Sequence, residues 1–302
     1  MNILTNKDTN SSNNKSDKSR KLCNDKTFPI FLLVLIILAY GLLTSKQGFY
    51  LDDWYILLFK EKLGSSGFLL YFSKDRPFES YPYILLMSIL GESPLGWSIF
   101  AILMRWTVTF SFWILLKNAF PEHKTVWKWA TVIFAVYPGF KFHWFGIMFS
   151  FFYLFLLFYI LSYIFMLKAI ENANKSNLYV LYTLAALVCL IIGILPQEYF
   201  YGMELFRPIF IFLVINKKEF GSPKKSFLKA VKQWIPYLIF FVGFTVYRIL
   251  FRNTYAYQIG ILDQLRLSPL LTIKEFVFKA ANSIIDAFVI SGSKAPGFND
   301  SL

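Results

Sequence analysis

The stretch FPIFLLVLIILAYGLLT, residues 28–44, decides the fold class of this chain. It carries no charged residue, and about 20 mostly apolar residues in a helix suffice to cross a bilayer. Six more apolar runs follow it, at 97–116, 126–142, 146–167, 178–195, 199–215 and 234–251. The sequence therefore predicts an all-α, polytopic transmembrane helix bundle with about seven spans.

The composition supports the same class. Of the 302 residues, 56% are hydrophobic and 16% are charged, whereas soluble domains carry about 25% charged residues. The net charge of +13 would indicate nucleic acid in a soluble protein, but in a membrane protein excess lysine and arginine collects in cytoplasmic loops. We therefore expect membrane lipids, and no nucleic acid, as partners. Cys23 and Cys189 form no disulfide pattern, and zinc, P-loop and dinucleotide motifs are absent.

The distribution of lysine predicts the orientation. Residues 1–27 form a polar, basic tail without the apolar region of a signal peptide, and they are expected to be disordered and cytoplasmic. If the short run 81–91 does not span, the lysine-rich loops 117–125, 168–177 and 216–233 also lie inside. Residues 28–251 then form the core, with one long external loop over 45–96 that holds interfacial helices.

The segment after the core, 252–302, is expected to be external or interfacial. Within it, 272–290 is either an interfacial helix or the start of an eighth span. The Lys- and Asn-rich composition is typical of an AT-rich genome, and the predicted location is a bacterial plasma membrane.

Two adjacent acids, Asp52 and Asp53, begin the amphipathic stretch DDWYILLFKEKL in the external loop. A carboxylate there is suited to act as a general base or to hold a divalent cation. Asp is also a preferred helix N-cap, and the pair precedes a helical pattern. Both interpretations stay open, since one acid can cap a helix while the other faces a cavity.

Other ionisable residues on the predicted external side are candidates for binding an anionic substrate. Arg76 in DRPFE offers a planar fork that suits phosphate, or lies in a solvated loop. Glu204 and Arg207 are three residues apart, on one helix face, and are able to form a pair that is either functional or structural. Glu198 lies at the mouth of the same helix and offers a second carboxylate.

Three arginines and a histidine complete the candidates. Arg105, inside ILMRWTV, needs a partner such as an outer carboxylate or a lipid phosphate. Arg248 and Arg252 lie four apart at an external helix end, where they bind an anionic ligand or reach to the headgroups. His143 in KFHWFG lies among aromatic residues and either packs or takes part in the site.

This arrangement resembles the GT-C superfamily of polytopic glycosyltransferases, which includes the protein O-mannosyltransferases and the aminoarabinose lipid A transferases. The resemblance covers about 28–251 and rests on YLDDWY (50–55), DRPF (75–78), SPLGWSIFAILMRW (93–106) and EYFYGMELFRP (198–208).

The resemblance implies a transferase that moves a sugar from a polyprenyl-phosphate donor to an acceptor on the external face. By this analogy Asp53 is the general base, with Asp52 as the alternative. The candidates for binding the donor phosphate, chosen for their positive charge and their predicted position on the external side, are Arg207, Arg248 and Arg252. The resemblance does not decide whether the enzyme needs a divalent cation. If it does, Asp52 or Asp53 is expected to hold the ion.

The chain departs from the superfamily in length, because it ends soon after the seventh apolar run and lacks the further spans common there. A truncated or non-catalytic homologue is therefore one alternative. A transporter or flippase of a lipid-linked or anionic substrate is another, although no internal repeat is present.

Overall fold

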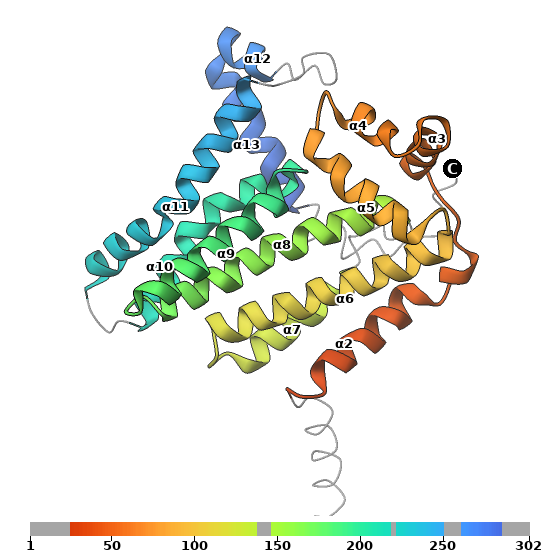
Figure 1. The fold of residues 1–302 in the computed structure, drawn as a ribbon. Coiled ribbons are helices and arrows are strands. Elements are labelled where there is room, and N and C mark those ends of the chain that lie inside the picture. Colours follow the sequence, from red (N-terminus) through yellow and green to blue (C-terminus); the bar gives the residue numbers. More distant parts are fainter. Residues whose placement is uncertain (1–24, 138–145, 219–221, 251–260, 286–302) are drawn as a thin grey trace, which may run out of the picture.

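The computed structural model describes residues 25–137, 146–218, 222–250 and 261–285. Within these ranges the chain is helical and contains no β-strand, which confirms the predicted all-α class (Figure 1). Among the described residues, five helices are long and apolar enough to cross a membrane: Phe28–Lys46, Pro94–Ala119 (α6), Gly146–Glu171 (α8), Ser176–Ile194 (α9) and Pro223–Leu250 (α11). These helices indicate an integral membrane protein. The first of them comprises α2 (Phe28–Ile36), a π-helical segment (Ile37–Gly41) and a 3-10 turn (Thr44–Lys46).

Two of the seven apolar runs do not form continuous helices of spanning length. The run 126–142 contains α7, Lys124–Ala135, whose 12 residues extend only about 18 Å. The run 199–215 contains a 3-10 helix, η4 (Glu198–Phe206), followed by α10 (Arg207–Lys218). Proline explains both breaks. Pro208 has no N–H to donate, so it cannot continue the helical hydrogen bonding from η4. Pro138 disfavours the helical conformation in the residue before it.

The first long loop, between the first span and α6, lies at one end of the bundle. That loop folds into α3 (Asp52–Leu63), α4 (Ser66–Phe72), the 3-10 turn η3 (Pro77–Glu79) and α5 (Ser80–Leu90). Figure 1 shows α3, α4 and α5 at the end where α6 and α8 begin. We call this the loop end. The 11 residues of α5 are too few to span a membrane, as predicted for 81–91.

The opposite end, which we call the lysine end, is marked by ion pairs between helix ends and connecting segments. Lys117 at the end of α6 pairs with Asp25 at 2.9 Å, and Lys217 at the end of α10 pairs with Glu122. The chain therefore runs alternately between the two ends: α2, α7, α9 and α11 lead to the loop end, and α6, α8 and η4–α10 lead back (Figure 1). Within the part of the chain that the structure describes, five of these segments reach spanning length.

Close packing of α8 with α6 and α9 forms the centre of the bundle. A Cβ added at Gly193 of α9 would come within 2.8 Å of the backbone nitrogen of Tyr159 in α8. Small residues permit such close approach of helices in membranes. Trp97 of α6 and Phe151 of α8 are fully buried next to each other, with ring centroids 5.7 Å apart. Beyond this bundle, α12 (Ile261–Leu267) and the mostly exposed α13 (Pro269–Ile285) form the last described elements.

Candidate functional site

A cavity of about 500 Å³ opens at the loop end, between the first long loop and the start of α8. Its polar lining includes Asp52, Asp75, Arg76, Glu79, Tyr83 and Tyr199. The loop supplies most of these side chains, while α8 supplies Met148 and η4 supplies Tyr199. A cavity of this size falls within the range of small-molecule sites.

The two adjacent acids point to different places. Asp52 lines the cavity, whereas Asp53 is 0% exposed and accepts a hydrogen bond at Oδ1 from the backbone N–H of Met148, at 3.1 Å. The preceding Leu51 has φ of 43°, a strained value for leucine, and the chain turns sharply there into α3. Asp53 thereby caps the N-terminus of α8, a position where carboxylates are favourable.

The environment of Asp53 also affects its protonation. Burial raises the pKa of Asp53 to about 6, although backbone N–H groups at the start of α8 act in the opposite direction. Its Oδ2 is buried and has no hydrogen-bond partner among the described residues. Asp53 is therefore held against α8 rather than presented to the cavity.

Arg76 lies at the centre of an ion-pair network beside the cavity. Its Nε is 3.4 Å from Glu198 of η4 and 3.6 Å from the neighbouring Asp75. Arg248 at the end of α11 pairs with the same Glu198 at 2.9 Å and donates to the backbone oxygen of Asp75 at 2.8 Å. The structure thus brings together Arg76, Glu198 and Arg248, three residues proposed separately from the sequence.

Glu79 is a second buried acid that lines the cavity. It is 2% exposed and accepts a hydrogen bond from Nε2 of Gln197 at 2.5 Å. Burial raises the pKa of Glu79 to about 7, while Gln197 and Arg76 act to lower it. From the sequence, Glu79 was only a neighbour of Arg76 in DRPFE and was not predicted as a site residue. Its burial depends on a contact with Gln197, which lies far away in the chain and therefore leaves no local pattern.

Aromatic rings form the inner wall of the cavity. Tyr83 is 2% exposed and stacks on Phe151 of α8 with centroids 3.7 Å apart. Burial, together with the nearby charges of Glu79 and Asp53, raises the pKa of the Tyr83 hydroxyl, which therefore stays neutral. Tyr199 lies under Arg76, whose guanidinium carbon is 5.6 Å from the ring centroid. Neither tyrosine was predicted as a site residue, because aromatic residues are common throughout the chain.

Glu204 and Arg207 form a pair, but not at this cavity. Arg207 is 0% exposed and donates to both carboxylate oxygens of Glu204 at 2.7 Å. It donates also to Ser162 at 3.1 Å, and its guanidinium lies over the rings of Tyr163 and Tyr237. The pair joins η4–α10 to α8 and α11 inside the protein.

Arg105 is likewise enclosed between helices. It donates to the hydroxyl groups of Tyr40 and Tyr153, each at 2.7 Å, and to the backbone oxygen of Ala135 at 2.9 Å. These partners belong to the first span, α8 and α7, so Arg105 connects three elements to α6. Two hydroxyl groups and a carbonyl oxygen thus contact the guanidinium, where the sequence suggested an outer carboxylate or a lipid phosphate.

His143 and Arg252 lie outside the described residues. Among the residues that the structure does describe, no three or more His, Cys, Asp or Glu side chains converge as metal ligands usually do. The comparisons with known proteins found no matching family model, curated protein or solved structure.

Proposed function

We propose that the chain is a membrane glycosyltransferase of GT-C type, which moves a sugar from a polyprenyl-phosphate donor to an acceptor at the loop-end cavity. The observation that carries the proposal is the position of Asp52, whose side chain lines a cavity of about 500 Å³ together with Arg76. A carboxylate and a guanidinium in one cavity suit a reaction that removes a proton and releases a phosphate.

In this mechanism Asp52 accepts the proton of the acceptor hydroxyl or amine as that group attacks the anomeric carbon. The bond from the anomeric carbon to the phosphate oxygen breaks, and polyprenyl phosphate leaves with the bonding electron pair. Arg76 stabilises the charge on the leaving phosphate. Asp53, the general base that the resemblance implies, is assigned a positioning role because it is fully buried against α8.

The surface around the cavity supports a lipid-linked donor. Large apolar side chains on α3 and α5 are exposed, among them Trp54 (60%), Leu85 (61%) and Ile89 (68%). In a bilayer such side chains face lipid, so a polyprenyl chain is able to lie beside the cavity within the membrane. The lysine-rich loops at the opposite end support an external position for the cavity, because excess lysine collects on the cytoplasmic side.

One observation favours a non-catalytic homologue instead. Arg76 and Arg248 are both paired with Glu198, and such a network also serves simply to fix the loop to the bundle. Donor binding under the proposal requires Arg76 to exchange part of this pairing for the phosphate.

The test is sugar transfer by the full chain in proteoliposomes made with membrane extract that supplies acceptors. The probes are polyprenyl-phosphate mannose and polyprenyl-phosphate glucose, each radiolabelled in the sugar. Asp52→Asn is expected to lower transfer by about 10²–10⁴-fold, the usual contribution of a general base. Glu92→Gln is the matched control, because Glu92 is another acid of the loop end and pairs with Lys60 rather than lining the cavity.

Undiminished transfer by Asp52→Asn would remove this residue from the mechanism. Movement of the intact donor between leaflets, without transfer, would indicate a flippase. Absence of both activities with every donor and extract would support the non-catalytic alternative.

A further inference from the structure

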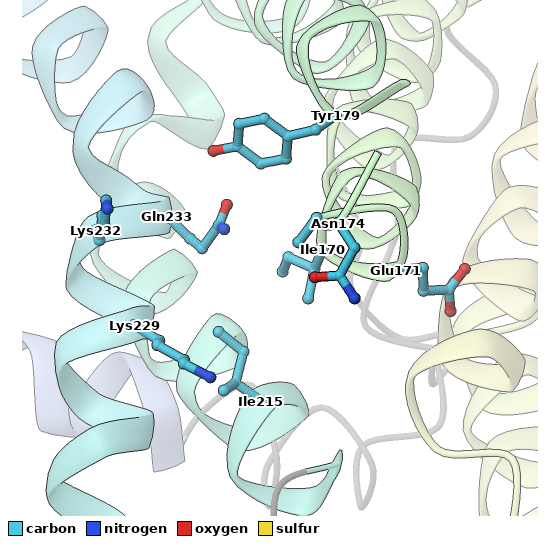
Figure 2. Close-up of a pocket in the computed structure, with 9 residues that line it drawn as sticks. Ile170, Glu171, Asn174, Tyr179, Ile215, Lys229, Lys232 and Gln233 are labelled. Atoms are coloured by element: carbon cyan, nitrogen blue, oxygen red, sulfur yellow. The ribbon is translucent and has the colours of Figure 1, made fainter. Parts of the chain in front are cut away.

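The loop-end cavity differs from a groove of similar size at the lysine end. That groove measures about 520 Å³ and lies between the α8–α9 turn and α11, with Asn174 and Gln233 on its two sides (Figure 2). Among the described residues, no buried polar side-chain atom of the groove lining lacks a hydrogen-bond partner. The lining of the loop-end cavity includes a residue with such an atom, Oε2 of Glu79. A buried acceptor without a partner, on a residue that lines a cavity, points to a ligand that donates to it.

Glu79 is hydrogen-bonded through one carboxylate oxygen within the described part of the chain. Its Oε1 accepts from Nε2 of Gln197 at 2.5 Å. Its Oε2 lies 4.0 Å from Nη1 of Arg76, whereas a charge-assisted hydrogen bond spans about 2.7–2.9 Å. Because a buried acceptor that stays unpaired is unfavourable, Glu79 has the capacity for one more donor.

Arg76 supplies a donor beside this acceptor. Its Nε donates to Glu198 at 3.4 Å, while its Nη1 forms no hydrogen bond with a described residue. An acceptor and a donor are thus separated by 4.0 Å at the cavity. A hydroxyl group both donates and accepts hydrogen bonds, so one hydroxyl group is able to contact Glu79 and Arg76 together.

The two charges favour a neutral group at this position. The Glu79 carboxylate would repel a phosphate oxygen placed at Oε2, and Arg76 would repel an ammonium group placed at Nη1. Other parts of the lining are apolar or aromatic, with Ile56, Tyr83 and Met148 among them. Apolar walls with a few placed polar groups are typical of small-molecule sites.

Adjacent residues at the start of η4 hold the acceptor and the donor in place. Gln197 donates to Glu79, and Glu198 accepts from Arg76. Gln197 is 2% exposed, so its contact with Glu79 lies inside the protein. The two polar groups are thereby oriented before a ligand binds, which reduces the cost of binding.

We propose that Glu79 and Arg76 together bind one hydroxyl group of the donor sugar, with Glu79 accepting its hydrogen bond and Arg76 donating to it. The inference rests on the proposed transferase function, because it names the part of the donor that the cavity recognises. The sugar is bonded directly to the donor phosphate, so Arg76 is able to contact both groups. The hydroxyl group reaches Oε2 of Glu79 as Arg76 exchanges part of its pairing with Glu198, the same exchange that the donor phosphate requires.

The experiment measures donor binding to the purified full chain in detergent at pH 8 by native mass spectrometry. The probes are polyprenyl-phosphate glucose, polyprenyl-phosphate mannose and bare polyprenyl phosphate, together with monodeoxy analogues of the tighter-binding sugar, each lacking one hydroxyl group. The wild-type protein is expected to bind one analogue roughly ten- to a hundredfold more weakly than the complete sugar donor, the usual effect of a hydrogen bond to a charged group.

Glu79→Gln and Glu79→Met test the partner of that hydroxyl group. Glu79→Gln is expected to weaken binding of the complete donor by roughly five- to tenfold, because a neutral acceptor replaces a charged one. Glu79→Met is expected to bind the complete donor and the discriminated analogue equally. Bare polyprenyl phosphate is expected to bind both variants as it binds the wild type. Glu92→Gln is the matched control, because Glu92 pairs with Lys60 and does not line the cavity.

Stability separates binding from folding. Glu79→Gln removes a buried charge and is expected to raise the melting temperature at pH 8 while it weakens sugar binding, which a merely structural role would not produce. If Glu79→Met fails to fold, Glu79→Gln carries the test alone. Weaker binding of every probe by Glu79→Gln, bare polyprenyl phosphate included, would overturn the proposal.

Transfer measured on the same preparations separates this proposal from the transferase function. Transfer by a protein that binds all monodeoxy analogues as tightly as the complete donor would overturn the hydroxyl site and leave the transferase intact. Sugar-dependent binding that Glu79→Met abolishes, without any transfer, would support the hydroxyl site and count against the transferase. Tighter binding of a polyprenyl-phosphate amino sugar than of both neutral donors would overturn the assignment in favour of an ammonium group.

Discussion

Met148 donates its backbone N–H to Oδ1 of Asp53 across 3.1 Å, although 95 positions separate the two residues in the chain. The bond fixes the start of α3 to the start of α8, and the first long loop is thereby held over the bundle. Because adjacent residues of a helix point in different directions, fixing Asp53 toward α8 turns Asp52 toward the cavity. The geometry of the proposed active site therefore depends on a capping interaction.

Asp53→Ala is expected to lower the free energy of unfolding by about 1–2 kcal/mol, because the first turn of α8 loses its carboxylate cap. Asp52→Ala is the paired variant and is expected to change stability by less than about 0.5 kcal/mol, since its side chain is exposed. Thermal unfolding in detergent, followed by circular dichroism, measures both. Equal destabilisation by the two variants would contradict the distinct positions of these side chains.

Stability is expected to fall as the pH rises from about 4 to about 7. The pKa of Glu79 is raised from 4.5 to about 7 and that of Asp53 from 3.8 to about 6, both because of burial. A carboxyl group with a raised pKa contributes stability that is complete below its unfolded pKa and is lost as the pH rises through its folded pKa.

Glu79→Gln tests this assignment. The neutral amide is expected to flatten the upper part of the profile and to stabilise the protein at pH 8 by roughly 2–3 kcal/mol. The exposed Glu92, substituted by Gln, provides a control with the same change of charge at the same end. A Glu79→Gln profile as steep as that of the wild type would show that another group titrates in this range.

The buried pair of Glu204 and Arg207 is expected to behave as a unit. Arg207→Met alone leaves an uncompensated carboxylate in the interior and is expected to cost about 3–5 kcal/mol. Glu204→Gln/Arg207→Met is expected to recover a large part of that loss, because no unpaired charge remains. A double-mutant cycle on the free energies of unfolding measures the coupling between the two residues. Strictly additive effects would contradict the 2.7 Å ion pair between Arg207 and Glu204.

Gly193→Ala is expected to loosen the contact between α8 and α9. The added methyl group would meet the backbone of Tyr159 within 2.8 Å, and neither backbone is free to yield. A cost of about 1–3 kcal/mol is expected, as for other overpacked interiors. Gly243→Ala in α11 is the control, because its Cβ meets nothing within 4 Å, and it is expected to be neutral or slightly stabilising. Similar melting temperatures for the two variants would contradict the packing described here.

The hydropathy of the chain was sufficient to predict a helical membrane protein, because apolar runs of spanning length have few alternatives in lipid. The distribution of lysine likewise predicted which loops lie together at one end of the bundle. Lysine-rich loops stay outside the bilayer, whatever the arrangement of the helices between them. Hydropathy alone overestimated the continuity of the helices in 126–142 and 199–215. A run of apolar residues keeps its high mean hydropathy even where a proline or a 3-10 segment interrupts the α-helix.

Only the tertiary structure decided which acid faces the cavity. Asp52 and Asp53 have the same chemistry and adjacent positions, so local sequence gives no reason to prefer either. The choice comes from a bond to Met148, and the contact of Glu79 with Gln197 arises in the same way, with 118 positions between the partners. The sequence determined the residue types of the site, whereas long-range packing determined which of them are buried, paired or open to a ligand.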